Sequence, residues 1–133
     1  MLTTIDKIAW VYTEDGRILC ARSKGKDTYY IPGGKREPGE SDAEALLREV
    51  REELSVALKP DTISLYGIFE AEAHGKTEGV QVKMTCYCAE FEGSLSPAAE
   101  IEEICWLNYR DRDRVSAVSQ LIFDQLHKQD RLI

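Results

Sequence analysis

The stretch GGKREPGESDAEALLREVREELSV, residues 33–56, carries the strongest helical pattern in the first half of the chain. Ser41 and Glu44 form an S-x-x-E capping box, which predicts a helix with Ser41 as its N-cap. Five apolar residues then recur at intervals of three and four, in one stripe that would pack the helix on a sheet: Ala43, Leu46, Leu47, Val50 and Leu54. Three glutamates share another face, which we expect to lie well away from this stripe: Glu49, Glu52 and Glu53.

Three carboxylates crowded on one helix face repel one another. An i, i+4 ladder of Glu44, Arg48 and Glu52 would offset part of that repulsion, and a divalent cation would offset it more fully. A solvated, ion-paired surface helix is the usual explanation of such a charge run. The loop ahead of the helix favours a metal site instead, because its double glycine permits close backbone approach to a ligand and Glu40 adds another carboxylate.

The same segment resembles the signature of the Nudix hydrolases, G-x5-E-x7-R-E-U-x-E-E-x-G-U, in which U is aliphatic. Eight positions fall in register with it: Gly34, Glu40, Arg48, Glu49, Val50, Glu52, Glu53 and Val56. The last glycine of the signature is Ser55 here. A left-handed residue often ends a helix at this place, so serine would strain the backbone by about 1 kcal/mol, or the helix would end in another way.

The resemblance covers essentially the whole chain and implies a metal-dependent hydrolase that cleaves a nucleoside diphosphate linked to another moiety. The implied cofactor is Mg²⁺ or Mn²⁺, because a diphosphate needs a cation in an acidic protein and Mg²⁺ prefers hard oxygen ligands. Glu52 and Glu53 are the main expected ligands. The full set of implied metal-binding residues is Gly33, through its carbonyl, Glu40, Glu49, Glu52 and Glu53.

The resemblance also implies the catalytic groups. Glu49 is the family-like candidate for the general base, and Arg48 would orient it. Some family members draw the base from a distal loop, which makes Glu100 and Glu103 the second candidates; an exposed acidic loop explains that pair equally well. The implied substrate loop consists of Gly33, Gly34 and Lys35.

Markers of particular subfamilies are absent or incomplete. The ADP-ribose type has a proline where this chain has Ala71, and the diadenosine polyphosphate type has a tyrosine where this chain has Ala73 and His74. The coenzyme A type has two upstream arginines, of which Arg22 matches one. By elimination we expect a (d)NTP or an oxidised dNTP, cleaved to the monophosphate. The alternatives are a hydrolase of ADP-ribose, a nucleotide sugar or a dinucleotide, and a non-catalytic nucleotide-binding or regulatory module.

The fold class that we expect is α+β, in a single domain over residues 1–133. It would be a Nudix-like α/β/α sandwich with a mixed sheet, one internal catalytic helix and a C-terminal helix. The apolar runs predict strands over residues 5–13, 17–22, 28–32, 62–73, 80–91 and 102–109. The first two would form a hairpin, and the terminal helix would span residues 111–127.

Composition limits the partners and the compartment. The formal net charge of −7 disfavours binding to a nucleic acid polymer, whose phosphates attract Lys and Arg. No apolar run approaches the length of a membrane span, and the first ten residues lack a signal-peptide pattern. Four cysteines without a C-x-x-C pair predict reduced thiols in a cytoplasmic protein. We expect a monomer or a homodimer that acts on a small nucleotide.

Overall fold

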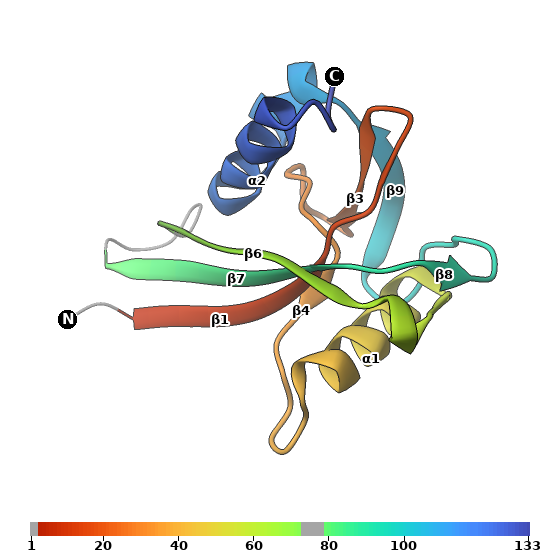
Figure 1. The fold of residues 1–133 in the computed structure, drawn as a ribbon. Coiled ribbons are helices and arrows are strands. Elements are labelled where there is room, and N and C mark those ends of the chain that lie inside the picture. The colour runs from red at the N-terminus through yellow and green to blue at the C-terminus, as the bar shows by residue number, and fades with distance from the viewer. Residues whose placement is uncertain (1–2, 73–78) are drawn as a thin grey trace.

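Alternate residues of the first strand, β1 (Thr3–Trp10), face two different helices, and this sets the layers of the fold. The computed structural model describes residues 3–72 and 79–133. Trp10 belongs to the apolar cluster that includes residues of α1 (Asp42–Leu54), whereas Ala9 belongs to the cluster that includes residues of α2 (Ala117–Lys128). One helix therefore covers each side of the sheet (Figure 1), and the predicted sandwich is confirmed.

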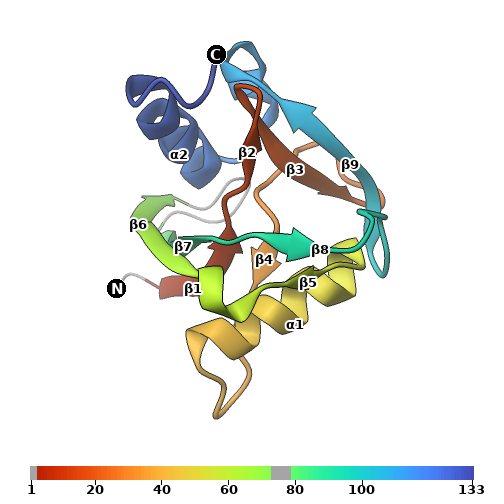
Figure 2. The ribbon, with the colours of Figure 1, turned by 45° about the vertical axis from the view of Figure 1, so that its right-hand side comes forward.

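The central sheet is mixed, with the strand order β4-β1-β7-β6. Its other members are β4 (Gly33–Gly34), β6 (Ser64–Glu72) and β7 (Val80–Cys88). Only β7 runs parallel to β1. A second sheet, set across the first in Figure 2, contains β2 (Thr13–Glu14), β3 (Arg17–Ser23) and β9 (Ile101–Leu107). The short strands β5 (Ala57–Leu58) and β8 (Phe91–Glu92) pair with each other, and β5 is followed by a 3₁₀ turn over Pro60–Thr62.

The predicted hairpin of residues 5–13 and 17–22 is only partly correct. β1 ends at Trp10 within the central sheet, and of residues 5–13 only Thr13, in β2, belongs to a strand that pairs with β3, in the registers Thr13↔Ile18 and Glu14↔Arg17. Asp15 and Gly16 both have positive φ, as a two-residue hairpin turn requires. One apolar run therefore supplies strands to two sheets. The pattern of apolar residues along the run does not show where it divides.

The predicted strand over residues 28–32 is wrong. Tyr29 and Tyr30 form only isolated bridges, and ladder pairing begins one residue beyond Pro32, at β4. Proline lacks the N–H that a ladder needs. Gly33 has φ +152°, and a Cβ placed on it would lie 2.1 Å from the carbonyl oxygen of Ile8. The close approach of the double-glycine loop to β1 therefore requires glycine.

Helix α1 begins as predicted, because both hydrogen bonds of the Ser41–Glu44 capping box are present. The apolar stripe differs by one residue: Ala43 is exposed, and Ala45 is buried in its place. The helix ends at Ser55, which adopts the left-handed conformation with φ 65°. The Ser55 hydroxyl donates to the carbonyl of Ser96 at 3.1 Å, and this bond offsets part of the backbone strain.

The terminal helix starts later than predicted. A 3₁₀ segment spans Tyr109–Arg114, with Asn108 and Asp111 forming a capping box at its start, and α2 begins at Ala117.

The four cysteines are free thiols. The marker positions Ala73 and His74 lie outside the described residues.

None of the helices within residues 3–72 and 79–133 combines the length and the apolar composition that crossing a bilayer requires.

Candidate active site

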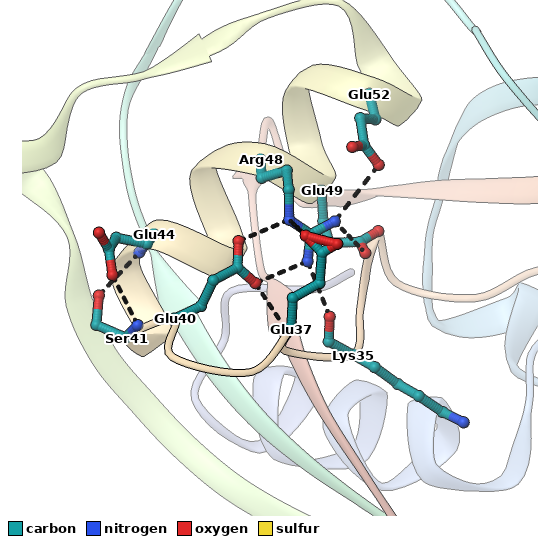
Figure 3. Close-up of polar contacts among 8 residues, drawn as sticks. All are labelled: Lys35, Glu37, Glu40, Ser41, Glu44, Arg48, Glu49 and Glu52. Carbon is teal, nitrogen blue, oxygen red and sulfur yellow. Dashed lines mark hydrogen bonds and ion pairs between the residues drawn. The ribbon is translucent and has the colours of Figure 1, made fainter.

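Arg48 lies at the centre of an ion-pair cluster between α1 and the loop that precedes it (Figure 3). Its Nε and Nη2 contact the two carboxylate oxygens of Glu40 at 2.7 and 2.9 Å. Nη1 contacts Glu49 at 3.0 Å and Glu52 at 3.5 Å, and Nη2 also donates to the carbonyl of Lys35 at 3.0 Å. One guanidinium therefore fixes the loop to the helix and holds the Glu49 carboxylate.

Glu40 is the best-stabilised carboxylate of this cluster. Besides its two bonds to Arg48, it accepts the backbone N–H of Glu37 at 2.7 Å. The Arg48 bonds, and then that N–H, lower the pKa of Glu40 to about 2. Glu44 does not join the expected ladder with Arg48, because its side chain caps the helix at Ser41.

Glu53 has the opposite surroundings. Its side chain is buried, with 4% relative exposure, and one carboxylate oxygen accepts the N–H of Gly33 at 3.3 Å. Burial raises its pKa to about 8, and the negative charge of Glu49 adds to the rise. The expectation that this face lies well away from the apolar stripe is wrong for Glu53. It follows Leu46 by seven residues and Val50 by three, so it lies beside the buried face.

Glu49 interacts both with Arg48 and with the buried Glu53. It contacts Arg48 at 3.0 Å, and its carboxyl group packs so closely on Gly34 that a Cβ there would lie 2.5 Å from its Cδ. Burial is the main cause of a raised Glu49 pKa, which Arg48 partly offsets. Gly34 thus leaves room for a carboxylate, while Gly33 allows the approach to β1.

A cavity of about 870 Å³ brings several predicted site residues together. Those that line it are Gly33, Gly34, Lys35, Glu49, Glu53 and Glu100. Glu40 and Glu52 are not among its lining residues and contact Arg48 instead. The cavity therefore combines the expected substrate loop with carboxylates from α1 and from the segment before β9.

The two distal candidates separate. Glu100 lines the cavity, whereas Glu103 does not. The Glu103 carboxylate accepts a hydrogen bond from the Tyr29 hydroxyl at 2.7 Å and pairs with Arg22 at 3.2 Å. These contacts, with that of Tyr29 the larger, lower the Glu103 pKa. The Glu103 side chain thus links β9 to Tyr29 and Arg22. Glu100 is the distal carboxylate that lines the cavity.

A smaller cavity of about 210 Å³ adjoins the large one and contains residues that the sequence did not single out as a site. The two share four lining residues: Lys7, Tyr30, Gly33 and Ser116. The rest of the small cavity is mainly apolar, with Ile5, Ile31, Val82, Met84 and Val118 among its walls. The signal for Lys7 was its position on one face of β1 with Ile5 and Ala9, where a lysine interrupts an apolar row.

The donors lining the large cavity suit a hard divalent cation in their chemistry. Carboxylate and carbonyl oxygens are the ligands that Mg²⁺ prefers, and a buried carboxylate beside another one is an arrangement that a cation relieves. In the structure the positive charge at Glu40, Glu49 and Glu52 comes from Arg48. Within residues 3–72 and 79–133, no three His, Cys, Asp or Glu side chains form a group arranged to hold a metal ion.

Known proteins resemble this chain in sequence. A family model described as the NUDIX domain matches residues 4–123. The CTP pyrophosphohydrolase of Escherichia coli K12 is 39% identical over 107 residues, which cover 77% of this chain and 74% of that protein. The RNA pyrophosphohydrolase of Halorhodospira halophila is 44% identical over 57 residues, or 43% of this chain; the match spans only 30% of that relative's length.

Solved structures share the fold at low sequence identity. The MutT NUDIX hydrolase of Burkholderia pseudomallei superposes with a TM-score of 0.75 at 22% identity, covering 93% of this chain and 98% of that one. The E. coli ORF135 protein superposes with a TM-score of 0.69 at 24% identity, covering 96% and 91%.

Proposed function

The chain belongs to the NUDIX domain family of hydrolases, and from that premise we propose that it hydrolyses a nucleoside triphosphate to the monophosphate and pyrophosphate. We also propose that residues 1–133 form a single domain of this family. One observation carries the proposed activity: a cavity lined by Glu49, Glu53 and Glu100 at a double-glycine loop opens beside a smaller, mainly apolar cavity. The first suits the phosphates with their cation, and the second suits the base.

We propose that the reaction depends on Mg²⁺ or Mn²⁺. Glu49, Glu53 and the carbonyl of Gly33 would hold the ion, because all three residues line the large cavity. Glu52 is proposed as a further ligand, since its 3.5 Å contact with Arg48 is the longest of that cluster. Glu40 is proposed to hold Arg48. When bound, a divalent ion neutralises phosphate charge and lowers the pKa of water at the site.

Glu49 is the proposed general base, and Arg48 is proposed to orient it across their 3.0 Å contact. A base at this place removes a proton from water as the water oxygen bonds to phosphorus. The P–O bond to the leaving pyrophosphate breaks in the same displacement, and the monophosphate remains. Glu100 is the competing candidate because it lines the same cavity, whereas Glu103 is paired with Tyr29 and Arg22.

The smaller cavity supports a nucleoside substrate over an inorganic polyphosphate. Its apolar walls would take a flat base out of water, which is favourable in proportion to the apolar area removed. Tyr30 lies where the two cavities meet, and its hydroxyl is hydrogen-bonded to Ser23 at 2.6 Å. This hydrogen bond therefore holds the ring at the junction of the two cavities, between the expected place of the base and that of the phosphates.

The test is product analysis with a substrate panel at saturating Mg²⁺. We expect CTP, GTP, dNTPs or 8-oxo-dGTP to give monophosphate and pyrophosphate in equal amounts, and Glu53→Gln protein, prepared in parallel, to give less of both. Preferential cleavage of ADP-ribose, a nucleotide sugar or a dinucleotide would contradict the triphosphate assignment while retaining the hydrolase. No hydrolysis of any panel member would contradict the activity itself.

A further inference from the structure

Lys7 occupies a place that the signature segment does not explain. It lies on β1, one residue before Ile8, which pairs with Gly34, and so it stands beside the double-glycine loop. Its side chain is half-buried and lines both the large and the small cavity. Of the basic side chains in the part of the chain that the structure describes, it alone lines both.

The charges around Lys7 make that place suitable for an anion. The acidic residues that line the large cavity repel the phosphates of a nucleotide unless positive charge lies nearby; they are Asp27, Glu49, Glu53 and Glu100. Lys7 is close enough to Glu53 for its charge to favour the ionised carboxylate. Because it is half-buried, its attraction for an anion is screened less than that of a fully exposed lysine.

The other lysines that line the large cavity are less suited to binding an anion where the two cavities meet. Lys26 and Lys35 are exposed, lie on loops and do not line the small cavity. Lys7 lies instead on a strand that pairs on both sides, with β4 and with β7. The backbone of such an element is held in place, so a ligand that meets its side chain orders less of the chain than one that meets a lysine on a loop.

We propose that Lys7 binds the α-phosphate of the nucleotide, at the point where the base and sugar leave the small cavity and the polyphosphate enters the large one. This rests on the proposed triphosphate hydrolysis. The α-phosphate is the first anionic group counted from the base, so a cation shared by the apolar and the acidic cavity meets that group. Lys7 therefore sets the register of the substrate, with the base on one side and the reacting phosphates on the other.

The test compares ligands with and without that phosphate. The dissociation constants of CMP, cytidine, GMP and guanosine are measured by calorimetry in EDTA, so that no metal bridges the phosphate. Lys7→Gln should weaken monophosphate binding by about tenfold or more, as expected for a lost charged hydrogen bond, and leave nucleoside binding within about twofold. Lys7→Arg should restore most of the monophosphate affinity. KM for the triphosphate should rise far more than kcat falls.

Lys83 gives a matched control, because it is a half-buried lysine on the neighbouring strand β7 and lines neither cavity. Lys83→Gln should bind all four ligands like the wild type. Equal losses for nucleoside and monophosphate in Lys7→Gln, or no loss for either, would overturn the inference while triphosphate hydrolysis by the wild type stood. Absence of that hydrolysis would overturn the proposed function and the inference with it.

Discussion

Glu40, in the loop before α1, and Glu53, near the end of α1, belong to the same signature, yet their surroundings shift their pKa values in opposite directions. Glu40 is held by two contacts to Arg48 and by a backbone N–H, and its pKa falls to about 2. Glu53 is buried beside Glu49 with an N–H at 3.3 Å, and its pKa rises to about 8. The fold thus favours the ionised carboxylate at one end of the signature and the neutral carboxyl at the other, and such opposite pKa shifts are typical of a functional site.

The largest expected effect concerns Glu49, which contacts Arg48 and also lines the cavity. Loss of a general base typically costs about 10²–10⁴ in rate, so Glu49→Gln should lower kcat by that factor at saturating Mg²⁺. Glu103→Gln, at a carboxylate paired outside the cavity, should leave kcat within about threefold. The measurement is kcat for both variants and for Glu100→Gln, with metal affinity determined in parallel.

A different pattern would move the base to the distal loop. If Glu49→Gln mainly lost metal, while Glu100→Gln or Glu103→Gln lost turnover with metal retained, the assignment of Glu49 would be wrong.

Arg48 tests whether the two ends of the signature depend on each other. Arg48→Ala should lower kcat by about tenfold to a hundredfold with a smaller change in KM, because the guanidinium positions Glu49 and does not grip substrate. It should also lower the urea midpoint of unfolding, since Glu40 and Glu49 lose their partner. Steady-state kinetics and urea denaturation measure both. A large rise in KM with kcat intact would mean that Arg48 binds phosphate.

The helix was predictable because its signals are local. Ser41 and Glu44 lie three residues apart, and their capping box has the same form in the structure as in the sequence. The start of α2 was mispredicted although its signal is local too: Asn108 and Asp111 form a second capping box, which begins a 3₁₀ segment ahead of the helix. The division of the first apolar run between two sheets depends on β7 and β9, which lie about eighty and ninety residues away in the sequence, and was not readable.

The site residues, too, were predictable where their signal is local and not where it depends on distant contacts. The signature located Glu49 and Glu53 but not the burial of Glu53, because a charged residue is expected at the surface and only the packed sheet shows how far the helix is turned. The separation of Glu100 from Glu103 depends on contacts with Tyr29 and Arg22, which lie more than seventy residues earlier. Lys7 was missed because its significance lies in two cavities that are formed by distant segments.

The smallest effect expected is a pH dependence of opposite sign in Glu40→Gln and Glu53→Gln, measured by urea denaturation in EDTA. The folded pKa of Glu40 is depressed, so its contribution to stability is present above the unfolded pKa of about 4.5 and is lost as pH falls toward about 2. The folded pKa of Glu53 is raised, so stability is lost as pH rises from about 4.5 to about 8, because the carboxyl ionises in the unfolded state while it stays protonated in the folded state.

Glu40→Gln should therefore be less stable than the wild type at pH 6, with the difference shrinking below pH 4. Glu53→Gln should gain stability relative to the wild type as pH rises from 5 to 8. The same sign of change in both variants would remove the contrast between the two ends of the signature.

The central claim is that Glu53, whose ionisation is unfavourable in the folded protein, ionises to bind a metal ion, and Mn²⁺ binding tests it most directly. Calorimetric titration of Mn²⁺ into the wild type, Glu53→Gln and Glu103→Gln compares a cavity carboxylate with a paired one outside it. We predict that Glu53→Gln weakens Mn²⁺ binding by about tenfold or more and that Glu103→Gln binds like the wild type. Unchanged Mn²⁺ affinity in Glu53→Gln would contradict the account.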